Sequence, residues 1–160
     1  MYSTNPQVSI TLDRYGDINS LQQAIRSLFR LGGASNLADA LQLLRSRVFA
    51  SDAVRPGARL VALIVTEEPW CDSQIISDAY YLKNNMNVSI IGLVLTHYQG
   101  VDPGCWGRVV SSNQYIEVPN YNQIFRYISE VTQYVCGNVA SSPSKYVARE
   151  IYFKPKMLLL

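Results

Sequence analysis

Two nearly continuous apolar runs constrain this chain more than any other feature. They are RLVALIVT at residues 59–66 and VSIIGLVL at residues 88–95. Runs of this length and composition are typical of parallel strands that are covered on both faces. Between them, Ile76, Ala79 and Leu82 recur at helical spacing behind Asp72 or Ser73, either of which is a suitable N-cap. The sequence therefore predicts a strand, a crossover helix and a second strand, parallel to the first and adjacent to it.

The remaining periodicity extends this alternation of strands and helices. A short β-rich run, VSITL at 8–12, precedes a helical pattern that begins at Asp17, and a second one-sided helical stripe runs from Leu37 to Val48. A loop rich in Gly and Pro follows residue 95, then a weaker strand at 114–118 suited to a sheet edge, then a last helix from Tyr121 to Val135. We expect an α/β fold with an open, mostly parallel, Rossmann-like sheet and helices on both faces. One core is predicted to contain Leu63, Val65, Ile90, Ile91, Leu93, Ile124 and Ile128.

Length and charge limit the classes of function. The 160 residues are 48% hydrophobic and 16% charged, which suits one domain with a sizeable core. We assign it to residues 1–137 and expect residues 138–160 to form a basic, poorly ordered tail. The net charge of +2 is concentrated in that tail, so nothing predicts nucleic-acid binding. No apolar run approaches the roughly 20 residues of a membrane helix, and the first residues lack a signal-peptide pattern.

Adjacent carboxylates, Glu67 and Glu68, follow the first apolar run. Open α/β sheets form their ligand crevice at the carboxyl ends of their strands, so acids placed there point to catalysis, metal binding or helix capping. The only histidine, His97, follows the second run, where a catalytic base or an ordinary surface residue would both fit. Neither GxGxxG nor GxSxG occurs in the chain, so a Rossmann-like enzyme lacks its usual phosphate loop or nucleophile.

Four segments together resemble a von Willebrand factor A (vWA) domain over about residues 2–136. They are YSTNPQVSITLDRYGDINSLQQAIRSL, GGASNLADAL, LVALIVTEEP and NVSIIGLVL. The resemblance implies a non-enzymatic protein-binding module of extracellular matrix or cell-adhesion proteins. It also implies that a divalent ion at the strand ends is held by an Asp-x-Ser-x-Ser loop, a threonine after two glycines and the aspartate of Thr-Asp-Gly.

Only part of that metal site has counterparts here. Gly32 and Gly33 match the paired glycines, Ser35 stands at the threonine position, and Glu67 stands at the aspartate position. Leu37 and Ala38 replace a threonine and a glycine, Glu68 replaces the last glycine, and no Asp-x-Ser-x-Ser loop is present. Ser35 is alternatively an ordinary N-cap for the following helix. Mg²⁺ tolerates little deviation from octahedral geometry, so we expect a degenerate site with no metal cofactor, although a complete family member could hold Mg²⁺ or Mn²⁺.

The missing loop suggests a vWA domain truncated at its N-terminus, without the first strand and helix. Open sheet edges would remain, and these favour association with other chains. A fragment of this kind could also be inert, without specific binding, and this is an alternative to the adhesion module.

The cysteines acquire an interpretation from this arrangement. Cys71 and Cys105 follow consecutive parallel strands at one end of the sheet, so either a disulfide with Cα atoms less than about 7 Å apart or two unpaired thiols is expected. Cys136 matches a family cysteine whose usual partner is absent here. The triplet Asn87-Val88-Ser89 is a glycosylation acceptor, consistent with a secreted glycoprotein.

The predicted ligand surface consists of the strand-end loops 31–37, 67–73 and 96–107. Its candidate residues are Gly33, Ser35, Glu68, Trp70, His97 and Trp106. The two tryptophans could form an exposed aromatic patch for a protein partner, or could pack down onto the domain.

Overall fold

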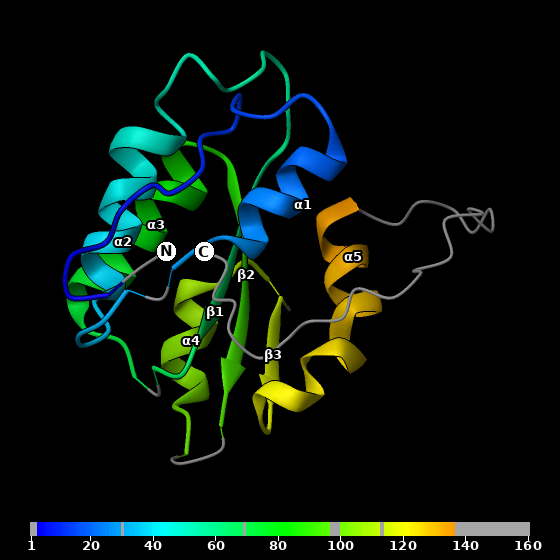
Figure 1. The fold of residues 1–160 in the computed structure, drawn as a ribbon. Coiled ribbons are helices and arrows are strands. Elements are labelled where there is room, and N and C mark those ends of the chain that lie inside the picture. The colour runs from blue at the N-terminus through cyan, green and yellow to red at the C-terminus, as the bar shows by residue number, and fades with distance from the viewer. Residues whose placement is uncertain (1–2, 30, 69, 97–99, 113, 137–160) are drawn as a thin grey trace.

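The computed structural model describes residues 3–29, 31–68, 70–96, 100–112 and 114–136 (Figure 1). In chain order the elements are α1 (Ile18–Arg26), α2 (Leu37–Leu43), a π-helical segment (Leu44–Val48), β1 (Leu60–Thr66), α3 (Ser73–Asn85), β2 (Val88–Leu95), α4 (Pro103–Val109), β3 (Tyr115–Val118), a 3₁₀-helix (Tyr121–Tyr127) and α5 (Ile128–Cys136). The predicted tail and His97 lie outside the described residues.

The three strands form one open parallel sheet in the order β1-β2-β3. The register of the first pair runs from Leu60 opposite Val88 to Thr66 opposite Val94. β3 pairs with the carboxyl half of β2 and lies at the edge. The predicted fold class and the parallel pairing of the two long apolar runs are therefore confirmed.

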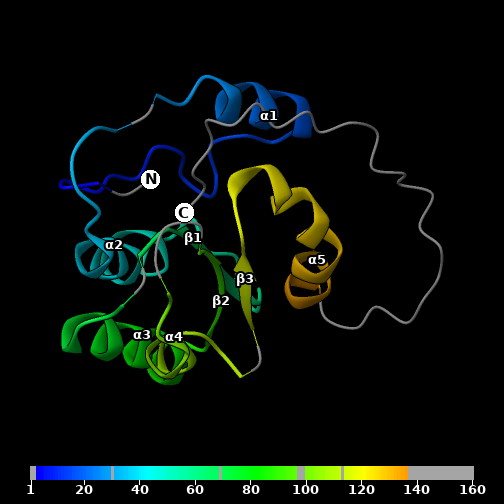
Figure 2. The ribbon, with the colours of Figure 1, turned by 90° about the horizontal axis from the view of Figure 1, so that it is seen from below.

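Helices cover both faces of the sheet, as Figure 2 shows. On one face α2, α3 and α4 pack onto even-numbered strand residues, in a cluster that includes Leu41, Ala62, Ile64, Ala79, Ile90, Val94 and Trp106. On the other face the 3₁₀-helix and α5 cover odd-numbered residues of β1 and β2 together with β3, in a cluster that includes Val65, Leu93, Leu95, Ile116 and Val118. The alternation of side chains along a strand sends neighbours to opposite faces.

The expectation of a single core was therefore wrong. Ile90 belongs to the first cluster, whereas Val65 and Leu93 belong to the second. Ile128, which we expected in the core, is 39% exposed at the first residue of α5. The sheet itself separates the two clusters, which is the ordinary consequence of a strand buried on both faces.

Residues 8–12 do not form the predicted strand. Val8 is 36% exposed and Leu12 is 56% exposed, and neither the β1 edge nor the β3 edge of the sheet pairs with this segment. A high β propensity mainly reflects packing against neighbouring strands, and here no neighbour is present. The helix predicted after it is confirmed, with Asp17 as N-cap, but no residue of α1 is buried.

The region expected to be a loop after residue 95 contains a helix, α4. Asp102 accepts hydrogen bonds from the backbone N–H groups of Gly104 and Cys105, and Pro103 occupies the first turn. The glycines lower the helix propensity of this segment, which is why the pattern suggested a loop. Burial of Cys105, Trp106 and Val109 on one side overrides that propensity.

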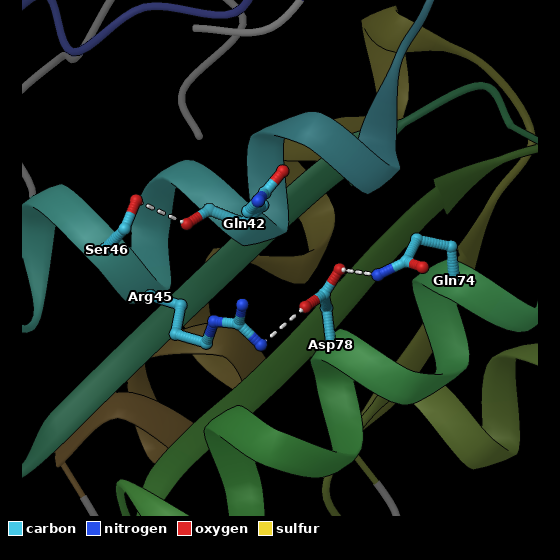
Figure 3. A network of polar contacts seen from close by, with 5 residues as sticks. All are labelled: Gln42, Arg45, Ser46, Gln74 and Asp78. Carbon is cyan, nitrogen blue, oxygen red and sulfur yellow. Dashed lines mark hydrogen bonds and ion pairs between the residues drawn. The ribbon is translucent and has the colours of Figure 1, made fainter.

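Polar contacts around one buried carboxylate join α3 to the π-helical segment after α2 (Figure 3). Asp78 of α3 is 1% exposed, and its Oδ1 lies 3.1 Å from a guanidinium nitrogen of Arg45. Its Oδ2 accepts a hydrogen bond from Gln74 Nε2 at 2.7 Å. A buried carboxylate is tolerated only where charge and hydrogen bonds compensate for lost solvation, so this network fixes how α3 packs against the helix before β1.

None of the helices among the described residues has both the length and the apolar character needed to cross a membrane.

Candidate functional site

The candidate site lies at the carboxyl ends of the strands. In Figure 1 the strands end toward the bottom of the view, and α2 and α4 begin at that same end. The segments there are the Gly-rich segment 31–36, the loop after β1 and the start of α4. This is the position at which open α/β sheets bind ligands.

Four interactions hold the loop after β1. Thr66, which is 1% exposed, accepts a hydrogen bond through Oγ1 from the N–H of Glu68 at 3.0 Å. The carbonyl of Glu68 accepts from Trp106 Nε1 at 3.1 Å. Cys71 and Cys105 form a disulfide with Cα atoms 5.8 Å apart, which confirms the predicted pairing. Asp72 caps α3, because its Oδ1 accepts from the N–H of Ile75 at 2.8 Å.

Trp106 is a structural residue of this site. It is fully buried and stacks on Tyr115, with ring centroids 6.5 Å apart and planes 15° apart. Of the two alternatives for Trp106, packing onto the domain is the one that the structure has, so its inclusion among the candidate ligand-surface residues is corrected: this ring is not available to a partner. Trp106 packs over Gly92 of β2, where a Cβ would make an ordinary contact with Trp106 Cε3 at 3.5 Å but would lie only 2.7 Å from Val110 Cγ1.

Trp70 has the opposite environment. It is 60% exposed, between a half-buried Glu68 and the disulfide-bonded Cys71, and Glu67 is exposed as well. The loop therefore presents one large aromatic ring and one free carboxylate to solvent.

The Gly-rich segment is held by a residue that the sequence analysis missed. Thr4 Oγ1 accepts a hydrogen bond from the N–H of Ala34 at 2.9 Å. Gly33 has φ +97°, a left-handed conformation that favours glycine, and a Cβ there would also collide with Thr4. A threonine thirty residues earlier gives no local signal, so only the folded chain reveals this contact.

Ser35 is exposed and does not cap α2. Asn36 is the N-cap: its Oδ1 accepts from the N–H of Asp39 at 3.1 Å, and its Nδ2 donates to Asp39 Oδ2 at 2.7 Å. Asn followed three residues later by an acid is a variant of the capping box, a signal present in the sequence.

The residues present do not fit a divalent metal ion. Across the described ranges, no group of three or more His, Cys, Asp or Glu side chains is placed to hold one. Glu67 and Ser35 are both exposed, and no hydrogen bond joins them within the described part of the chain. Leu37, at the position of a polar support, is 2% exposed and packs into the core.

The predicted glycosylation residue Asn87 and the unpaired Cys136 lie away from this edge. Asn87 is exposed between α3 and β2, with φ 55°, a left-handed conformation that asparagine tolerates. Its acceptor-triplet partner Ser89 donates a hydrogen bond to Gln114 Oε1 at 2.7 Å. Cys136 is an exposed free cysteine at the end of α5.

Comparison with known families decides the affiliation of the chain. The model of the von Willebrand factor type A domain matches residues 1–133. The chain belongs to the von Willebrand factor type A family. The vWA affiliation agrees with the parallel sheet and with the strand-end location of the candidate site.

Solved structures with a similar fold include three of proximal thread matrix protein 1 from the mussel byssus. They give TM-scores of 0.74, 0.71 and 0.75 at 16%, 15% and 16% identity. In each case the matched region covers 84% of the protein described here. The second is described as having zinc in its MIDAS motif, the metal-ion-dependent adhesion site. The chain spans about a third of each of those structures, namely 35%, 33% and 35% of their length. A search of curated protein sequences gave no significant match.

Proposed function

We propose that this vWA chain is a non-enzymatic, adhesion-type protein-binding module of an extracellular matrix protein, and that it binds its partner through the loop after β1. The observation that carries the proposal is the exposure of Trp70 beside Glu68 and Cys71, which are both held to the body of the domain. Tryptophan is enriched among the residues that dominate binding energy at protein interfaces.

The fixed backbone favours binding. The disulfide, the Trp106 hydrogen bond, the Thr66 hydrogen bond and the Asp72 cap restrain residues 66–68 and 71–73 before any partner arrives. A restrained loop loses little conformational entropy on association, so more of the contact energy appears as affinity.

Charge at this edge favours a basic partner. The loops 31–37, 67–73 and 96–107 contain four carboxylates and no lysine or arginine. Asp72 and Asp102 are engaged as helix caps, which leaves Glu67 exposed and Glu68 half-buried. Because the residues do not fit a metal ion, the carboxylates are available to lysine or arginine of the partner, whose complementary charge would speed encounter and set orientation.

An extracellular setting is supported by two features of the chain itself. Disulfides persist mainly in oxidising compartments, and Cys71 is bonded to Cys105. Asn87 is exposed, as a glycan acceptor must be. Expression in a secreting eukaryotic cell should give a mass decrease after glycan removal, and an Asn87→Gln variant should show none.

The binding experiment compares two aromatic residues of similar exposure. Trp70→Ala should reduce binding to immobilised fibrillar collagen, fibronectin or laminin at least about tenfold, because a central tryptophan anchor contributes about 2 kcal/mol or more. Tyr80→Ala, which removes a 63% exposed ring on α3, should leave binding unchanged. Glu67→Gln should weaken the binding and reduce its salt dependence.

Equal losses from Trp70→Ala and Tyr80→Ala would contradict the placement of the surface. Absence of binding to all three matrix proteins would contradict the adhesion proposal itself.

A further inference from the structure

We infer that α3 carries a second interaction surface, an uncharged stripe through which two copies of this chain form a weak antiparallel dimer. The stripe consists of the exposed residues Ser73, Ser77, Tyr80 and Asn84. The dimer does not depend on the loop surface proposed above.

The position of α3 leaves its outward side open. In Figure 2 α3 lies at the lower edge of the view with the sheet above it, whereas α1 and the segment before it lie at the upper side, away from α3. The inward residues Ile75, Ala79 and Leu82 pack into the core. Positions 73, 77, 80 and 84 recur at intervals of four and three residues, so they share the opposite side of the helix. These intervals are those of the a and d positions by which two helices pack together.

The stripe has no free charge. The only charged residues of α3 are Asp78 and Lys83, and both are engaged with the rest of the domain. Asp78 is 1% exposed beside Arg45, and Lys83 Nζ donates a hydrogen bond to the carbonyl of Val110 at 2.9 Å. The outward side of a surface helix normally carries its charges, whereas the centre of a protein interface is depleted of charge and enriched in tyrosine. The composition of α3 is therefore that of an interface.

Two tyrosines supply the contact area. Tyr80 is 63% exposed, and its neighbour Tyr81, which flanks the stripe, is 41% exposed. The guanidinium of Arg45 lies 4.7 Å from the centroid of the Tyr81 ring, and Asp78 holds that guanidinium in place (Figure 3). A ring that is already restrained loses little rotamer freedom on association, and tyrosine itself has only two side-chain torsions.

A second copy fits the stripe because the stripe is complementary to itself in size. With a two-fold axis between positions 78 and 79 of two antiparallel α3 helices, Tyr80 of each copy lies opposite Ser77 of the other. Asn84 likewise lies opposite Ser73. Each layer therefore pairs a large side chain with a small one, which allows the facing rows to interdigitate, and the axis makes every contact twice.

Charge is compatible with the same pairing. No residue of the stripe is charged, so the two identical surfaces meet without like-charge repulsion. The antiparallel arrangement also places the N-terminus of each α3 beside the C-terminus of the other, which the helix dipoles favour. A contact made by one pair of short helices buries less than about 1,200 Å², and interfaces of that size are weak and transient.

Sedimentation velocity of the full chain over a range of concentrations tests the dimer. The wild-type chain should move from 18.0 kDa toward twice that mass as its concentration approaches about 1 mM. Tyr80→Ser should weaken the dimer at least about tenfold, because the two-fold axis removes two rings at once. Ser77→Tyr should weaken it as well, because each new ring would meet Tyr80 of the other copy.

An equimolar mixture of these two variants tests the register. In the mixed dimer, the tyrosine introduced at position 77 of one chain faces the serine introduced at position 80 of the other, and the second layer keeps its native pair. Every large side chain again meets a small one, so the mixture should dimerise at least as well as the wild type. Damage to the fold of either variant would not be repaired by mixing.

Two further variants separate this surface from the rest of the molecule. Tyr15→Ser and Trp70→Ala remove exposed rings outside the stripe, and both should leave the dimer intact. Each Trp70 loop keeps its own affinity in the dimer. The Tyr80→Ala control of the matrix experiment therefore applies at chain concentrations well below the dissociation constant of the dimer.

A wild-type chain that stays at 18.0 kDa up to about 1 mM overturns the inference. A dimer that Tyr80→Ser and Ser77→Tyr leave unchanged, or that their mixture fails to restore, overturns the proposed stripe and its register.

Discussion

Replacing Gly92 with alanine should destabilise the chain by about 1–2 kcal/mol, although alanine is normally the better residue inside a strand. Gly92 lies in the central strand, between Ile64 of β1 and Tyr115 of β3. The added Cβ would lie 2.7 Å from Val110 Cγ1, where carbon atoms prefer about 3.5–4.0 Å. Val110 is 4% exposed, and a β-branched side chain has few alternative rotamers, so it cannot simply turn away.

The magnitude is a balance of two terms. Overpacking a core by one methyl group costs about 1–3 kcal/mol. The loss of backbone freedom in the unfolded chain returns about 0.4–1 kcal/mol for a glycine-to-alanine change. Urea denaturation with the disulfide intact should show the difference, and the melting temperature should fall by about 2–8 °C for a domain of this size.

Two further variants test whether the contact with Val110 causes the loss of stability. Gly107→Ala adds a methyl group with nothing within 4 Å, and it should stabilise α4 by up to about 1 kcal/mol. In a Val110→Ala background the Gly92→Ala change should become neutral or stabilising, with a coupling energy of about 1 kcal/mol or more. Additive effects in that double mutant, or a Gly92→Ala variant as stable as the wild type, would refute the packing argument.

Three other predictions follow from the site. Replacing both Cys71 and Cys105 with serine should cost about 4 kcal/mol, from the chain entropy of a loop of 34 residues; denaturation that is unaffected by the replacement would contradict this. Calorimetric titration should show no Mg²⁺ or Mn²⁺ binding with a dissociation constant below about 100 μM, because Ser35 and Glu67 alone would leave about four of the six coordination positions of the ion to water. Tighter binding that is lost when Ser35 or Glu67 is replaced by alanine would contradict this prediction. Burial, followed by a hydrogen bond to a neighbouring carboxylate, raises the pKa of Tyr115. The unfolded tyrosine ionises first, so stability should fall as pH rises above about 10, and less steeply after replacement by phenylalanine.

The sequence was most informative where local pattern and tertiary environment agree. The runs at 59–66 and 88–95 are almost continuously apolar because both faces are covered, so their pairing and direction could be predicted. The position of Cys71 and Cys105 after neighbouring strands likewise predicted their proximity.

Prediction failed where a distant partner decides the outcome. Residues 8–12 have strand propensity but no strand beside them, and their exposed side chains show the result. α4 forms despite two glycines because it buries Cys105, Trp106 and Val109 against the sheet, a tertiary contact that no local pattern encodes. The contact between Thr4 and Ala34 was missed for the same reason.

The attachment of α5 has a consequence for how the chain opens. No residue of α5 is buried, and Arg59, at the entrance to β1, donates hydrogen bonds to the carbonyls of Tyr134 and Val135 in its last turn. A helix held by half-buried contacts and one exposed arginine forms a separate cooperative unit of low local stability. Its amides should exchange with deuterium well before those of β2, so that α5 detaches while the sheet and its opposite helical layer remain folded.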